Sequence, residues 1–218
     1  MDSIENFAQT GISLEISPEV TAEALACRVD HNSAVLLLPP TGETTAQAVL
    51  HELLHIHRYW NEQIPKIMPV SESDSRWSIA NAIDNSLEHT IIVPREAEYG
   101  FEPYGYWNAV TRRNFSDYPW PEIADQFARR KNCLIGWLYC SKLIDDADVK
   151  ETVRSALRSE GLLHDGEQFA AKVSRLASNK AQMISAAIRF LHIPRKDVRL
   201  LYCDIQGRRR RIEEVPAY

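Results

Sequence analysis

"VLHELLHIHRYW", residues Val49–Trp60, places two histidines and a glutamate inside a stretch that otherwise has the pattern of a buried helix. The stretch contains no glycine or proline, and its apolar residues occupy most of a helical circumference. On a helix, residues four positions apart lie about 40° apart around the axis, so His51 and His55 share one face and Glu52 lies at its edge. Buried imidazoles and carboxylates are costly without partners. We therefore expect hydrogen bonds or a bound metal ion at this face.

The residues "HELLH" match the H-E-x-x-H signature, and on this motif the chain resembles the zincin metallopeptidases. The resemblance implies that His51 and His55 bind Zn²⁺ and that Glu52 acts on the zinc-bound water. The competing interpretation is a chance match, with both histidines hydrogen-bonded in the core. A metzincin-like extension of the motif is excluded, since Arg58 and Asn61 stand where that pattern has glycine and histidine.

A third metal ligand is expected on the following helix, in "WSIANAIDNSLEHT". Its polar residues recur at helical spacing and form one stripe, which by itself is typical of a solvent-facing helix side. In gluzincin-like peptidases, a glutamate from a later helix is the third ligand, and the resemblance assigns this role to Glu88. Asp84 could then orient a ligand histidine. His89 is the competing ligand, or else a donor to the oxyanion.

The resemblance implies a peptidase mechanism that uses the metal ion and Glu52 together. Zinc lowers the pKa of its bound water to about 7, and Glu52 takes the proton and passes it to the leaving amine. The substrate is a peptide or protein, which the strand "SAVLLL" before the motif helix could hold by strand addition. The oxyanion requires a donor, for which the candidates are Arg95, Tyr99, Tyr104, Tyr106 and His89.

The fold class that we expect is α+β, with a small zincin-like core and a mainly helical C-terminal half. Two strands should form a hairpin around "DHNS", and the capping-box pair Thr44 and Gln47 should start the motif helix. A second helix should run over residues 76–92 and end before Pro94, followed by an aromatic-rich structured loop or set of short elements. Helices should follow from Pro121, and a hairpin turning at Gly207 should close the chain.

The length of 218 residues predicts a single domain, residues 1–218. Along the sequence we divide it into a catalytic core over 1–120, a helical elaboration over 121–200 and the terminal hairpin over 201–218. The four cysteines form no C-x-x-C pair and are interpreted as free thiols, with Cys133 and Cys140 in core packing.

The composition predicts a cytoplasmic protein that does not enter membranes. The N-terminus is acidic, and no apolar run approaches the ~18 residues of a membrane span. A size and location of this kind are similar to those of the short regulatory zincins of the ImmA/IrrE group, which cleave a partner protein. The net charge of -5 makes nucleic-acid binding unlikely. The alternative function is a non-catalytic binding protein with a structural metal, contacting nucleic acid or an acidic partner through Arg208–Arg211.

Overall fold

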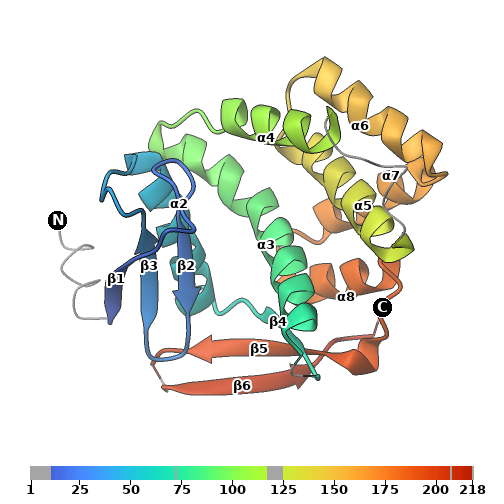
Figure 1. Ribbon diagram of the computed structural model, residues 1–218. Helices are drawn as coiled ribbons and strands as arrows, with labels where there is room; N and C mark the ends of the chain where they lie inside the picture. Colours follow the sequence, from blue (N-terminus) through green and yellow to red (C-terminus); the bar gives the residue numbers. More distant parts are fainter. Residues whose placement is uncertain (1–10, 72, 117–124, 207, 218) are drawn as a thin grey trace. The chain divides into compact units, whose positions relative to one another are not determined.

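The computed structural model describes residues 11–71, 73–116, 125–206 and 208–217, and it confirms the α+β class (Figure 1). The chain forms two compact units. Unit 1 contains Met1–Lys66 and Leu200–Glu214, and unit 2 contains Ile67–Arg199 and Val215–Tyr218. Unit 1 thus combines segments that are far apart in the sequence.

The first sheet lies in unit 1 and has the strand order β1-β3-β2. Strands β2 (Ala26–Val29) and β3 (Ala34–Leu38) pair antiparallel and form the predicted hairpin. Strand β1 (Ile12–Ile16) was not predicted, although "ISLEI" alternates, and it pairs in parallel with β3. The expectation that β3 accepts a substrate strand is therefore wrong, because β3 is the central strand and both its edges are already paired.

Helix α2 (Ala46–Trp60) is the motif helix, and it packs against β2. It begins one residue later than the capping-box spacing suggests: the side chain of Thr45 accepts a hydrogen bond from the N–H of Ala48 at 3.1 Å. The hydroxyl of Thr44 instead donates to the carbonyl of Ala22. Ile56 and Trp60 enter a small core with Ala34 and Cys203, which fixes the rotation of α2 in unit 1.

A second sheet has the order β4-β5-β6, formed by β4 (Lys66–Pro69), β5 (Val198–Asp204) and β6 (Arg209–Glu214). Strand β4 was not predicted. Strands β5 and β6 form the expected terminal hairpin, while its turn at Gly207 lies outside the described residues. The boundaries between the units fall at the start of β4 and within β5.

Helix α3 (Asp74–Glu96) in unit 2 is longer than predicted, because it continues through Pro94. Pro94 falls in the last turn, where its missing N–H costs one hydrogen bond but does not end the helix. A 3-10 turn, η1 (Ala97–Tyr99), follows and stops at Gly100, whose φ of 86° is in the left-handed region that glycine tolerates. The glycine, and not the proline, is the actual stop signal.

The aromatic stretch that was predicted to be a loop or short elements contains a full helix, α4 (Tyr104–Ser116). Its start is capped by the Glu102 carboxylate, which accepts from the N–H groups of Tyr104 and Gly105 at 2.8 and 3.1 Å. The predicted start of the helical half at Pro121 lies outside the described residues. The spacing of aromatic residues masked the helical period in the sequence.

Residues 126–190 of unit 2 form four helices, α5 to α8, which confirms the predicted helical C-terminal half. Helix α5 packs on α6 and α7, and α7 packs on α8. Figure 1 shows these helices beside one another in unit 2. Their core is apolar and includes Cys133 and Cys140, which confirms that these two cysteines serve packing. All four cysteines are free. The bounds are Gln126–Lys142 for α5, Ala147–Ser159 for α6, Leu163–Arg175 for α7 and Lys180–Phe190 for α8.

Candidate metal centre

The two motif histidines lie together on one face of α2, as their spacing predicts. The ring centroids of His51 and His55 are 5.0 Å apart, with the rings edge to face. His55 is buried and also stacks on Tyr59 at 6.5 Å. His57 points elsewhere: its side chain is 44% exposed, and its Nδ1 lies 3.6 Å from a Glu62 carboxylate oxygen. The first two histidines therefore form the face that can share one ion.

Glu52 is buried beside this pair and is held by the neighbouring strand β2. Its carboxylate accepts hydrogen bonds from the thiol and from the backbone N–H of Cys27. Burial raises the pKa of Glu52, while His51 and the hydrogen bonds from Cys27 oppose that shift. A carboxylate with a raised pKa is closer to the range in which a general base both takes and returns a proton.

The contact between Cys27 and Glu52 was not predicted from the sequence. Burial, followed by the charge of Glu52, raises the pKa of the Cys27 thiol well above its ordinary value. The thiol consequently stays protonated at neutral pH and acts as a hydrogen-bond donor. No motif relates Cys27 to Glu52, because the contact depends on how α2 packs on β2.

Glu88 lies in unit 2 and is fully buried next to a lysine ammonium. The Nζ atom of Lys180, the first residue of α8, lies 2.6 Å from Glu88 Oε1 and 3.2 Å from Asp84 Oδ1. Lys180 itself is only 3% exposed. Asp84 Oδ1 also accepts a hydrogen bond from the N–H of Ile67 at 3.3 Å. The polar stripe predicted on α3 thus forms, but its two acids face a buried cation and not solvent.

His89 lies on α3 in unit 2, within an aromatic cluster made by α4 and α5. Its ring centroid is 4.6 Å from that of Trp107, and its Nδ1 lies 3.4 Å from the hydroxyl of Tyr139. Burial raises the pKa of Tyr139 to about 12, so the hydroxyl remains protonated. In the tautomer in which Nδ1–H donates to the hydroxyl oxygen, Nε2 has a free lone pair for a metal ion, which is the usual arrangement for a ligand histidine.

The other oxyanion candidates are Arg95, in the last turn of α3, and three tyrosines in η1 and α4. Tyr106 contacts Trp107 edge to face at 5.4 Å and is 44% exposed. Tyr104 starts α4 and is partly buried, whereas Tyr99 is 61% exposed. Of the candidate tyrosines, Tyr106 is therefore the one that contacts Trp107, which also contacts His89.

The arginines of the terminal hairpin are used within unit 1. Arg210 pairs with both carboxylate oxygens of Asp30, and Arg209 pairs with Asp204 at 3.1 Å. Arg211 bonds to Glu213 at 3.0 Å and covers the ring of Tyr202 at 4.3 Å. These pairs give three of the four arginines an internal structural role.

No protein-family model, curated protein or solved structure matches this chain. Within the described ranges, none of the helices combines the length and the apolar character that crossing a bilayer demands. The functional argument therefore rests on the chemistry of the site residues.

Proposed function

We propose that the chain is a zinc-dependent peptidase in which His51 and His55 bind the metal and Glu52 is the general base. The observation that carries the proposal is the α2 face, where two adjacent imidazoles lie next to a buried glutamate with a raised pKa. A structural zinc site has no use for such a base. The proposed substrate is a peptide bond in a protein partner, and the proposed location is the cytoplasm.

The third ligand that we propose is His89. Glu88 was the expectation from the resemblance, and it stays a possible ligand, but its carboxylate already balances the Lys180 ammonium at 2.6 Å. Coordination by Glu88 would leave that buried ammonium with less compensation, at a cost of several kcal/mol. His89 carries no such charge and already has a Tyr139 hydroxyl at its Nδ1.

Three imidazoles fit zinc, because neutral nitrogen ligands with one open tetrahedral position are a known catalytic donor set. A bound zinc would supply Lewis acidity and an activated water there. Glu52 would take the proton from that water and pass it to the leaving amine, while the Cys27 thiol holds its carboxylate in place. Tyr106 and Tyr104 are the proposed donors to the oxyanion.

The substrate strand that we propose adds to β2, since β3 has both edges paired. Strand β2 lies at the edge of the β1-β3-β2 sheet formed by the described residues. The thiol and the backbone N–H of Cys27 both donate hydrogen bonds to Glu52. A peptide along this edge would therefore pass close to the general base and would pair with β2 through backbone groups other than the Cys27 N–H.

Elemental analysis and zinc-competition titration of purified protein test the ligand set. We expect about one zinc per chain, with His51→Ala, His55→Ala and His89→Ala each losing it. His57→Ala is the matched control, because it removes a histidine from the same helix that faces another direction. If Glu88→Gln strips the metal while His89→Ala retains it, Glu88 is the third ligand. Protein that takes up no zinc at all contradicts the proposal.

Hydrolysis of a quenched-fluorescence peptide library tests the role of Glu52. The variant Glu52→Gln should keep zinc and fold while losing turnover by several orders of magnitude. Loss of zinc in this variant would make Glu52 a ligand. Unchanged turnover in this variant would contradict the role of Glu52 as general base. No turnover by the unaltered, zinc-loaded chain would support the alternative function, a binding protein with a structural metal.

A further inference from the structure

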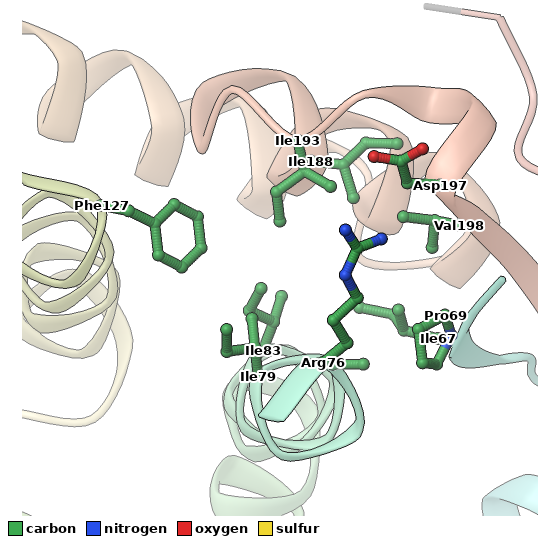
Figure 2. A pocket seen from close by; sticks show the side chains of 11 residues that line it. Ile67, Pro69, Arg76, Ile79, Ile83, Phe127, Ile188, Ile193, Asp197 and Val198 are labelled. Carbon is green, nitrogen blue, oxygen red and sulfur yellow. The ribbon is translucent and has the colours of Figure 1, made fainter. Parts of the chain in front are cut away.

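Unit 2 contains a pocket of about 240 Å³ whose walls are mostly apolar (Figure 2). Ile79 and Ile83 project from α3 into one side of it, while Ile188 of α8 and the nearby Ile193 form the opposite side. Phe127 of α5 lies at one end, with its ring beside the isoleucines. The volume lies below the ~300–1,000 Å³ of sites for drug-sized ligands, so an occupant must be small.

Two opposite charges line the other end of this pocket. The guanidinium of Arg76 extends from α3 toward the side that carries the Asp197 carboxylate (Figure 2). In the part of the chain that the structure describes, neither side chain forms an ion pair with the other or with a third residue. The backbone of Asp197 is fixed, because its N–H donates to Pro194 and its carbonyl accepts from Val70, both at 2.9 Å.

We propose that this pocket binds a small apolar zwitterion, namely a free amino acid with an aliphatic or aromatic side chain. The ligand carboxylate pairs with Arg76, the ligand ammonium pairs with Asp197, and the side chain fills the isoleucine and phenylalanine walls. A guanidinium matches a carboxylate in a two-point contact, and an apolar side chain gains from burial between such walls.

The charge pattern selects this class over two simpler ones. An apolar monocarboxylate would pair with Arg76 but would bring a second negative charge next to Asp197. An apolar amine would pair with Asp197 but would bring a second positive charge next to Arg76. A ligand with both charges meets an opposite charge at both groups, Arg76 being exposed and Asp197 partly buried, whereas either single-charge ligand meets one like charge.

The pocket also suggests a regulatory connection, and this part alone rests on the proposed function. Ile79 and Ile83 belong to the same helix as His89, the proposed third zinc ligand. A ligand that fixes this helix would change the affinity for zinc, and zinc would change the affinity for the ligand by the same factor. The binding of the amino acid itself does not depend on the zinc site.

Isothermal titration calorimetry of the full chain with free leucine, isoleucine, methionine and phenylalanine tests the binding. We expect at least one of them to bind with a saturating isotherm. The matched ligands 4-methylpentanoate and 3-methylbutylamine, which resemble leucine but lack the ammonium and the carboxylate respectively, should bind at least about tenfold more weakly. No binding by any of the four amino acids, or equal binding by the single-charge analogues, overturns the proposal.

Variants separate the pocket from nonspecific binding. Arg76→Gln and Asp197→Asn should each weaken binding at least about tenfold. The control Arg113→Gln changes an arginine of the same unit outside the pocket and should leave affinity unchanged. Circular dichroism of each variant establishes that it is folded. Undiminished affinity in a folded Arg76→Gln or Asp197→Asn variant contradicts the assigned contacts. Repeating the titration with His89→Ala tests the coupling separately, because binding that persists there supports the pocket whatever the fate of the zinc site.

Discussion

Helices α2 and α3 each bury a glutamate, but they balance its charge in different ways. On α3, Glu88 and Asp84 share the ammonium of Lys180, so this cluster contains both its negative and its positive charges. On α2, Glu52 receives hydrogen bonds from Cys27, and its neighbours are the imidazoles of His51 and His55. The α3 cluster is complete within unit 2, whereas the α2 cluster is rich in groups that favour a metal cation.

The difference shows that a polar stripe in a sequence does not by itself distinguish a structural ion pair from a ligand site. Both sets recur at helical spacing, and each contains a buried glutamate, Glu52 on α2 and Glu88 on α3. What separates them is a single residue, Lys180, which comes from a helix almost a hundred positions away in the chain. Variants at Lys180 test how the charge of Glu88 is compensated, and variants on α2 and at Cys27 test the surroundings of Glu52.

The largest effect is expected from Lys180→Met. Removing the ammonium takes away the cation that two buried carboxylates share, which should lower the free energy of unfolding by about 3–5 kcal/mol. Urea denaturation measures the loss. Lys142→Met is the control, because it replaces an exposed lysine of the same unit. Adding Glu88→Gln to Lys180→Met should restore part of the stability, and a further loss in the double variant would contradict the ion-pair assignment.

The second effect concerns the proposed zinc site. Free zinc at a hundred times its dissociation constant should raise the free energy of unfolding by about 2.7 kcal/mol, since the ion binds the folded state. Thermal or urea unfolding with and without zinc measures this shift. The shift should vanish in His55→Ala and persist in His57→Ala. A zinc-dependent shift of equal size in both variants would show that the α2 face does not bind the ion.

A smaller effect is expected at Cys27. Cys27→Ala removes a hydrogen-bond donor from buried Glu52 and should cost about 1–3 kcal/mol in the free energy of unfolding. Cys27→Ser keeps a donor of similar size, so it should lose less. Zinc content should be the same in both variants, because neither changes a proposed ligand. Equal stability of the alanine variant and the unaltered chain would mean that the thiol contributes nothing to holding Glu52.

The smallest effect is expected for Arg210→Ala at the surface of unit 1. Its hydrogen bonds, together with those from His31, lower the pKa of Asp30 below its ordinary value. A depressed pKa stabilises the folded state above pH ~4, where the unfolded carboxyl is ionised, and this contribution disappears as the pH falls through the folded value. The variant should therefore lose no more than about 1 kcal/mol at pH 7 and nothing in strong acid. Unfolding measured at several pH values checks this; a loss that persists in strong acid contradicts the assignment.

Much of the fold could be predicted because its signals are local. The hairpin of β2 and β3, the motif helix and the helical C-terminal half follow from periodicity and turn residues. The errors come from non-local pairing and from competing stop signals. Strand β1 makes β3 a central strand, which no local pattern near β3 reveals. Helix α3 passes Pro94 because the left-handed Gly100 provides a later end.

In the candidate site, too, local spacing could be predicted from the sequence and contacts between distant segments could not. The shared face of His51 and His55 follows directly from spacing on one helix. The partners of Glu52, Glu88 and His89 come from β2, α8 and α5, so helix phase alone could not identify Cys27, Lys180 or Tyr139. Sequence spacing thus predicts which residues share a face, but tertiary packing decides which charges on that face are already balanced.

The division of unit 1 between two distant segments has a consequence for synthesis on the ribosome. The core beneath α2 includes Cys203, and the β5 and β6 segments complete the same unit. Helix α2 is translated long before these residues, so it can pack on β2 and Ala34 early, but the part of its apolar face that packs on Cys203 stays uncovered while residues 67–199 emerge. Unit 2 has nearly all of its chain by then and can fold first, as segments rich in local helical contacts do. Nascent chains that stop before residue 200 should therefore expose the motif helix to chaperones and proteases, and the motif acquires its protected form only after the last strands leave the exit tunnel.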